Sequence, residues 1–130
     1  MDDIRKKTRR EEREDIIKKL YEMDINNGDI SFLEETDFVK ESLSGVNENI
    51  AKIDEIITLN LNRWKINRLT YIDRAIIRFA TYELYYTETP HEIVINEALN
   101  LTRKYSDEGD NKMVGFTNKV LDNIKKYLNK

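Results

Sequence analysis

The sequence predicts an all-α protein of about six or seven helices, arranged as two small bundles that share a central pair of helices. Apolar residues recur at three- and four-residue spacing over most of the chain, which is the spacing of one face of a helix. Only four glycines and one proline occur among the 130 residues, so few tight turns are indicated. We expect a single domain over residues 1–130, because a chain of this length can bury most of its apolar surface in one core.

The first half of the chain is expected to form three or four helices. One helix spans about residues 8–24, and one or two short helices lie within 29–43. A further helix begins with Asn47 as its N-cap and leads to Trp64. The apolar stripes of the first and the last of these helices are Ile16, Ile17, Leu20 and Met23, and Ile50, Ile53, Ile57 and Leu61.

Two helices meet at a short turn in the centre of the chain, within residues 62–105. Thr70 is predicted to cap the first, with Asp73 reaching back to the Thr70 backbone in a capping box. Thr89 precedes Pro90 at the start of the second helix, and Glu92 completes a second capping box. The predicted buried face of the first helix consists of Ile72, Ala75, Ile76, Phe79, Ala80, Glu83 and Leu84.

The last third of the chain continues the helical pattern. The β-branched run 93–95 reads as a strand in isolation, but Val94, Ala98, Leu101 and Tyr105 keep helical spacing around it, so we expect a helix. A polar loop at 106–111 follows. The final helix is predicted to carry its apolar stripe on Met113, Phe116, Val120, Ile124 and either Tyr127 or Leu128.

Composition excludes several classes of protein. The chain has no cysteine, which excludes thiolate metal sites and catalytic cysteine, and His91 is its only histidine. No polar cluster suggests catalysis or a bound cofactor, so we expect a non-enzyme. A net charge of −3 argues against a protein that coats nucleic acid with its whole surface. No apolar run approaches the roughly 20 residues that cross a bilayer, and a cytoplasmic location is the expected default.

The N-terminal region has the opposite charge. Six of the nine residues from Arg5 to Arg13 are basic and two are acidic. Five of the basic residues fall on the same side of the first helix as its apolar stripe, namely Arg5, Lys6, Arg9, Arg10 and Arg13. Charged groups cannot enter an apolar core unpaired, so we expect a basic arm at about 5–13 that projects beyond the bundle toward an anionic partner. The alternative is a solvated terminus without function.

Several short motifs follow one another in a specific order, namely W-x-x-x-R-L from Trp64, I-D-R-A-I-x-R from Ile72, then Y-E-L, T-P and V-I-N-E-A. Their order and spacing resemble those of the NusB family of transcription antitermination factors. The resemblance extends over nearly the whole chain. The matching N-terminal and C-terminal motifs are Arg9-Arg10 with Arg13-Glu14 and Leu20-Tyr21, and Phe116 with Asn118 and Val120-Leu121-Asp122.

The resemblance implies a NusB-like fold and a function. A protein of this family binds boxA, a short single-stranded RNA, together with the ribosomal protein NusE. It joins the RNA polymerase elongation complex with other Nus factors, notably on ribosomal RNA operons. By resemblance, the residues at the RNA are Arg9, Arg10, Arg13, Arg78, Lys112 and Phe116, and those at NusE are Tyr21 and Asp73.

The chain also departs from the family pattern. Glu11 and Glu12 stand where basic or small residues are usual, and each is expected to repel phosphate. Three residues, 113–115, separate Lys112 from Phe116 where the family has no gap. From the residues alone, Phe116 fits a core position, and Arg74 and Arg78 fit ion pairs with Asp73 or Glu83.

These departures leave other functions open. One is a protein–protein adaptor that kept the fold and lost RNA affinity. Another is an accessory RNA-binding domain for a ribosomal RNA methyltransferase, because NusB-like domains also occur fused to such enzymes. The sequence leaves open whether the chain forms a homodimer.

Overall fold

The computed structural model describes residues 6–27, 35–62 and 64–130. These ranges hold six α-helices, one 3₁₀ helix and no strand, which confirms the all-α prediction. The helices are α1 (Arg9–Ile25), α2 (Asp37–Glu48), α3 (Ile50–Leu59), the 3₁₀ helix η1 (Ile66–Arg68), α4 (Tyr71–Tyr86), α5 (His91–Tyr105) and α6 (Lys112–Tyr127).

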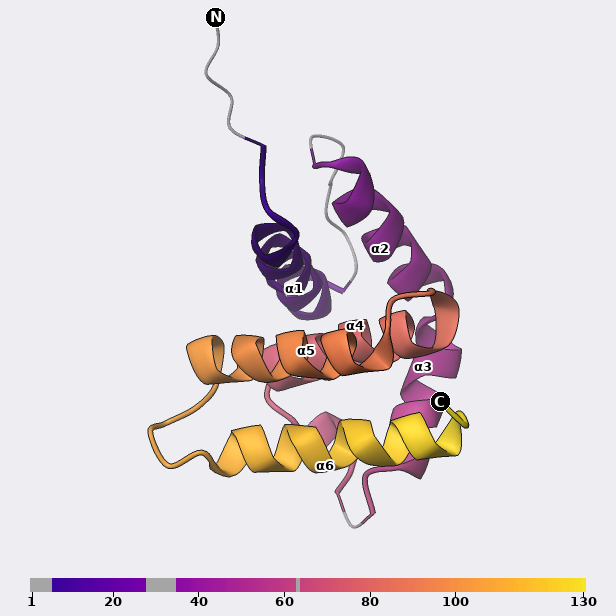
Figure 1. Cartoon of the computed structure of the whole chain (residues 1–130), viewed down its shortest axis with the longest axis vertical. Coiled ribbons are helices and arrows are strands. Elements are labelled where there is room, and N and C mark those ends of the chain that lie inside the picture. Colours follow the sequence, from indigo (N-terminus) through magenta and orange to yellow (C-terminus); the bar gives the residue numbers. More distant parts are fainter. Residues whose placement is uncertain (1–5, 28–34, 63) are drawn as a thin grey trace, which may run out of the picture.

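Helix α4 lies at the centre and contacts each of the other five α-helices. Helices α1 and α2 pack against it and against each other, and so do α5 and α6, which run side by side in opposite directions (Figure 1). Helix α3 contacts both α2 and α6. The two groups of helices therefore share α4, and the core is continuous through it. Its largest fully buried side chains are Ile16, Ile17, Leu43, Ile53, Ile56, Ile57, Ile76, Ile77, Leu121 and Ile124.

The helix starts agree only in part with the predicted caps. At α4, the Thr70 hydroxyl accepts from the Asp73 N–H at 3.2 Å, as predicted, but the Asp73 carboxylate accepts from the Thr70 hydroxyl at 2.7 Å rather than from its backbone. The second predicted capping box is wrong. Helix α5 begins after Pro90, and the Thr89 hydroxyl donates to Glu83 at 3.3 Å. A complete capping box occurs instead at α1, between Thr8 and Glu11.

The prediction that Asn47 starts a helix is also wrong, because Asn47 lies inside α2. Val39, Leu43 and Val46 continue the helical spacing and are all buried, so α2 runs on to Glu48. Residues 28–34, where part of the predicted short helices would lie, are outside the described residues.

In α6 the buried face is rotated from the predicted one. Val120 and Ile124 are buried as predicted, and they are joined by Val114, Thr117 and Leu121. Met113 and Phe116 are half-buried at the edge of this face, and Tyr127 is exposed. The rotation leaves one side of Phe116 at the surface.

Gly45 of α2 allows a close approach to α4. A Cβ atom at this position would lie 2.6 Å from the Tyr82 hydroxyl oxygen. The Tyr82 ring is itself held between Phe79 and Tyr86, with ring centroids 6.4 and 5.8 Å away. Because these rings enclose it, Tyr82 cannot move aside without disturbing its neighbours. Burial, together with the charges of nearby glutamates, also raises the pKa of Tyr82.

We expect Gly45→Ala to lower the free energy of unfolding by about 1–3 kcal/mol through overpacking. Gly115 of α6 is the matched control, since a Cβ there meets nothing within 4 Å. Gly115→Ala is expected to stabilise the protein by about 0.5–1 kcal/mol, because alanine is the better helix former. Urea unfolding of both variants measures the difference, and stabilisation by both would contradict the close approach.

Candidate nucleic-acid interface

Arg13 does not project from the protein. Its side chain is 7% exposed and pairs with Glu83 of α4 through two hydrogen bonds, Nε to Oε1 at 3.1 Å and Nη2 to Oε2 at 2.9 Å. The expectation that Arg13 extends to an anionic partner is therefore wrong in this structure. The premise that a charge cannot be buried unpaired holds, because Glu83 supplies the pairing within the core.

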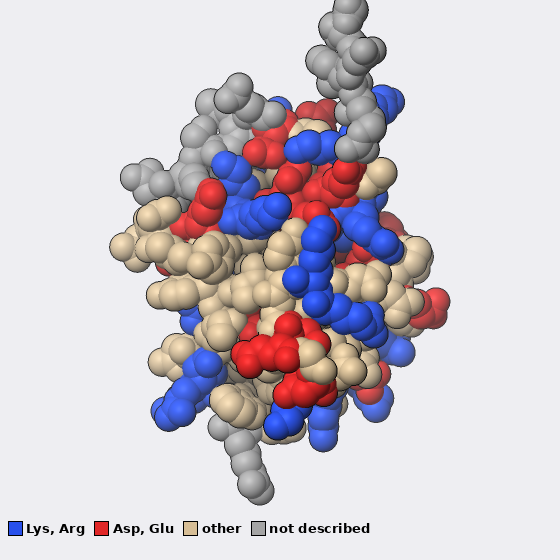
Figure 2. Space-filling view, turned by 90° about the vertical axis from the view of Figure 1, so that its left-hand side faces the viewer, with Lys and Arg blue, Asp and Glu red and all other residues tan. Residues whose placement is uncertain are grey.

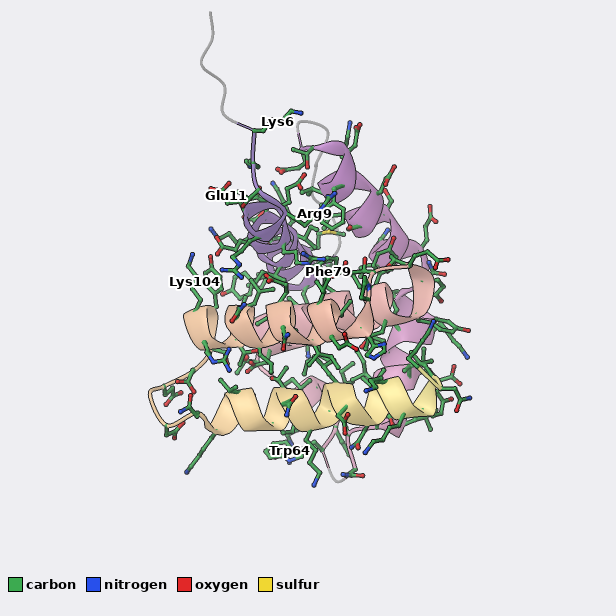
Figure 3. All side chains as sticks on the ribbon, viewed as in Figure 1. Lys6, Arg9, Glu11, Trp64, Phe79 and Lys104 are labelled. Atoms are coloured by element: carbon green, nitrogen blue, oxygen red, sulfur yellow. The ribbon has the colours of Figure 1, made fainter. Side chains whose placement is uncertain are left out.

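Arg9 and Arg10 lie one turn earlier and are more than half exposed. The Arg9 guanidinium lies 3.8 Å from the centroid of the Phe38 ring and donates to Glu12 at 3.1 Å. Figure 3 shows Arg9 between α1 and α2. Both residues belong to α1, so within the predicted arm only residues 6–8 of the described chain precede the helix. Arg5 lies outside the described residues.

Arg10 is bound from another helix. Its Nε and Nη2 atoms donate to the two carboxylate oxygens of Glu97 in α5, at 3.2 and 3.1 Å. This hydrogen bonding and the charge of Glu97 raise the pKa of Arg10. Sequence reasoning missed Glu97, which lies 87 positions away along the chain. The one sequence feature that could have pointed to Glu97 is its place in the V-I-N-E-A motif.

Glu11 and Glu12 have structural roles at the start of α1. The Glu11 carboxylate accepts from the Thr8 N–H at 2.8 Å and so completes the capping box. Glu12 is nearly buried and accepts from Arg9 and from the Thr36 hydroxyl. The Glu12 charge is thus directed at Arg9 and Thr36 rather than outward.

A second pair joins α1 and α5. Lys104 donates to Glu14 at 2.7 Å, and this hydrogen bond raises the pKa of Lys104. Within the N-terminal region, Lys7, just before α1, donates to Asp15 of α1. On the face shown in Figure 2, acidic side chains lie among the basic ones rather than apart from them. The surface around the basic stretch therefore carries a smaller excess of positive charge than the stretch alone.

Arg78 and Arg74 pair with helices other than their own. Arg78 donates to Asp54 of α3 at 2.8 and 2.7 Å and to Asp24 of α1 at 3.3 Å. Arg74 donates to Asp24 at 2.8 Å. The alternative of pairs with Asp73 or Glu83 is wrong, because Asp73 accepts from Thr70 and Ser106 and Glu83 pairs with Arg13. Arg78 therefore joins three helices and is mostly buried.

Lys112 and Phe116 line a groove at the other end of the molecule. It has a volume of about 330 Å³, and Trp64, Arg68 and Asp73 also line it. The Trp64 ring meets the Phe116 ring edge-on, with centroids 5.9 Å apart. The same two rings line a second groove of about 580 Å³, together with Lys119 and Asn123. Both volumes fall in the range of ligand pockets, roughly 300–1,000 Å³.

Trp64 is the residue of this groove that the sequence did not identify as functional. Trp64 is 52% exposed, whereas tryptophan residues are highly buried on average. It follows α3 in a loop, and its own N–H donates to Leu61 O at 3.2 Å. The sequence feature that could have identified Trp64 as a site residue is its place before Arg68 in the W-x-x-x-R-L motif.

Tyr21 lies on an exposed apolar patch. Its ring meets that of Tyr71 edge-on at 6.3 Å, and Ile25 is exposed one turn further along α1. Asp73, the other residue assigned to NusE, is only 3% exposed. Its carboxylate accepts from Thr70 and, at 2.6 Å, from Ser106. Asp73 therefore holds the start of α4 to the end of α5.

The predicted site residues thus form separate groups. Arg9 and Arg10 lie at the start of α1, whereas Asp73, Lys112 and Phe116 share one groove. Figure 3 shows Arg9 in the upper part of the molecule, between α1 and α2, and Trp64 at the bottom, below α6. Within the described ranges no group of three or more metal-ligating side chains occurs. In the same ranges, no helix has the length and apolar character needed to cross a bilayer.

The ion pair between Arg13 and Glu83 yields a stability prediction. Arg13→Ala leaves the Glu83 carboxylate buried without its cation, so we expect a loss of about 3–5 kcal/mol in the free energy of unfolding. Arg10→Ala removes an exposed pair on the same helix and is expected to change stability little. Urea unfolding compares the two, and equal stability of both variants would contradict a structural role for Arg13.

Comparison with known proteins agrees with this fold. The model of the NusB family matches residues 3–126. The transcription antitermination protein NusB of Clostridium botulinum (strain Alaska E43 / Type E3) is 47% identical over 107 residues, which cover 82% of this chain and 74% of the relative. That of Staphylococcus aureus (strain MRSA252) is 36% identical, with 92% and 99% covered.

Solved structures agree as well. T. maritima NusB matches with a TM-score of 0.80 and 30% identity, over 94% of this chain and 93% of that one. A crystal structure of antitermination factors NusB and NusE in complex with dsRNA matches with a TM-score of 0.78 and 25% identity, over 92% and 96%. This chain therefore belongs to the NusB family of transcription antitermination proteins, a family without enzymatic activity.

Proposed function

We propose that this protein is a transcription antitermination factor that binds boxA RNA together with NusE. It acts in the cytoplasm and joins the RNA polymerase elongation complex with other Nus factors, notably on ribosomal RNA operons. The supporting relative is the NusB structure that contains both NusE and RNA. The observation that carries the proposal for this chain is the pair of accessible guanidinium groups, Arg9 and Arg10, on a firmly anchored helix.

Arg9 and Arg10 are proposed to bind RNA directly. A guanidinium group can donate to phosphate oxygens and stack on an unpaired base, which suits single-stranded RNA. Arg13 contributes indirectly, because its bond to Glu83 fixes α1 on α4 and so places the two exposed arginines. Arg78 acts in the same indirect way through Asp24 and Asp54.

Lys112 and Phe116 are proposed as a second RNA contact, with Trp64 as a further member. Unpaired bases stack on aromatic rings, and each such stack contributes about 1–3 kcal/mol. The half-buried Phe116 and the exposed Trp64 offer ring surface, and Lys112 and Arg68 provide positive charge along the same groove. RNA that reaches both ends of the protein would pass along its long axis.

The surface around Tyr21 is proposed to bind NusE. Tyrosine combines a large apolar area with a polar tip and is enriched at protein interfaces. Asp73 supports this surface from within, since it ties α4 to Ser106. Asp73 also lines the groove of Lys112 and Phe116, so the proposed RNA and NusE surfaces adjoin each other there.

The division between the two surfaces is testable by reciprocal variants. Replacing Arg9 and Arg10 by Ala should weaken boxA binding and reduce the slope of log K against log [salt] by about 1.4, or 0.7 for each lost cation. NusE binding should remain unchanged. Tyr21→Ala should give the reverse pattern. Fluorescence anisotropy with boxA RNA and a scrambled RNA measures the first effect, and calorimetry with NusE the second.

A control for charge alone is the replacement of Lys125 and Lys126 by Ala, at the far end of α6. This variant removes the same charge and should keep its affinity for boxA RNA. If it weakened binding as much as the loss of Arg9 and Arg10, the proposed site at the start of α1 would be wrong.

Trp64 offers a direct readout of the second contact, because it is the only tryptophan in the chain. We expect boxA RNA to quench its fluorescence as a base stacks on the Trp64–Phe116 pair. Phe116→Leu keeps the apolar packing and removes the ring, so it should weaken RNA binding by about 1–3 kcal/mol. Unchanged Trp64 fluorescence at an RNA concentration that saturates the anisotropy signal would exclude RNA from this groove.

The adaptor alternative also has a structural observation in its favour. Carboxylates bind Arg10, Arg13 and Lys104, which lowers the attraction of this region for RNA. An adaptor would bind NusE and show equal, weak affinity for boxA and scrambled RNA. The anisotropy measurement therefore separates the two functions.

A further inference from the structure

Arg10 differs from the other arginines of α1 in how its carboxylate partner is placed. Its guanidinium is 62% exposed, yet both oxygens of Glu97 bind it from α5. Glu83 is buried and also accepts from the Thr89 hydroxyl. Glu12 binds the exposed Arg9 through one oxygen and accepts from the Thr36 hydroxyl with the other. Glu97, whose side chain is 18% exposed, is therefore the carboxylate that binds an exposed arginine of α1 through both of its oxygens.

A phosphate that approaches Arg10 meets two opposing charges. The Glu97 carboxylate lies about 3 Å from the guanidinium nitrogens and cancels much of the Arg10 field at longer range. Exposed ion pairs are weak, so a phosphate can displace the carboxylate. The negative charge of Glu97 nevertheless stays close to the bound phosphate, and this lowers the binding free energy that the contact between Arg10 and phosphate contributes.

We propose that Glu97 competes with RNA phosphate for Arg10 and thereby limits RNA affinity. The inference rests on the proposed RNA-binding function. It also replaces the expectation from the sequence that Glu11 and Glu12 weaken RNA binding, since those two carboxylates hold Thr8, Arg9 and Thr36. The limiting charge comes from α5, far along the chain.

The competing charge can be removed without unfolding the protein. Helix α1 stays attached to α5 through Lys104 and Glu14 and to α4 through Arg13 and Glu83. Glutamine at position 97 still offers a carbonyl oxygen as an acceptor for Arg10. Glu97→Gln therefore removes the charge and retains much of the shape, which separates competition from simple orientation of the arginine.

The test is anisotropy with a boxA-like RNA oligonucleotide and a scrambled control, with NusE present, at several salt concentrations. We expect Glu97→Gln to bind boxA RNA about two- to five-fold more tightly, the range that exposed ion pairs allow. The slope of log K against log [salt] should steepen by about 0.7, equivalent to one further cation. In an Arg10→Gln background, Glu97→Gln should have no effect.

Glu92→Gln is the matched control, because Glu92 is an exposed glutamate in the first turn of the same helix. A gain of the same size from Glu92→Gln would show a general charge effect and overturn the proposal. Weaker RNA binding by Glu97→Gln would also overturn it, because Glu97 would then act by orienting Arg10. A gain in RNA affinity that persists in the Arg10→Gln background would overturn it as well.

If the wild-type protein prefers boxA RNA and Glu97→Gln has the same affinity as the wild type, this inference alone is wrong. Absence of boxA preference in every variant overturns the proposed function and this inference together.

Discussion

The bond between Arg13 and Glu83 sets the orientation of α1, and much of the surface follows from it. The two hydrogen bonds, both near 3 Å, fix the rotation of α1 about its axis against α4. With Arg13 directed inward, Ile16 and Ile17 one turn later enter the core, where both are fully buried. Arg9 and Arg10 one turn earlier are more than half exposed. The buried pair thus lies where α1 changes from exposed arginines to core isoleucines.

Charged pairs between helices recur through the rest of the molecule. Asp24 bonds to Arg74 and Arg78, and Arg78 also bonds to Asp54, so α1, α3 and α4 meet at one half-buried cluster. Such pairs add little stability at the surface but specify which faces meet. The high charge content of the sequence, 36%, therefore serves packing geometry as well as solubility.

Periodicity predicted the features that depend on local sequence. The helical character of the chain, most of the buried face of α4 and the continuation of α5 through its β-branched residues all follow from spacing. In α4, Ile72 is only half-buried, and Ile77 and Thr81 are buried although they were not predicted to be. Features that depend on contacts across the chain were not predictable. The pairing of Arg13 with Glu83 spans 70 positions, so sequence reasoning placed that arginine outside the core. The prediction of Asn47 as a cap failed for a related reason, because burial of Val46 in the core extends α2 past it. For the candidate site, the charge pattern predicted that Arg9 and Arg10 are exposed, and they are. Tyr21 and Asp73 were assigned only through the family resemblance; Tyr21 is exposed, whereas Asp73 is buried.

The central position of α4 has a consequence for how the protein opens. Each of the other five α-helices packs against it, so its buried backbone amides become accessible only when several helices separate together. Their rate of hydrogen exchange then reports the stability of the whole domain, whereas amides at the ends of the outer helices report local fraying. A ligand bound to any surface stabilises the native state as a whole. Slower exchange in α4 would register such binding even where the ligand lies far from that helix.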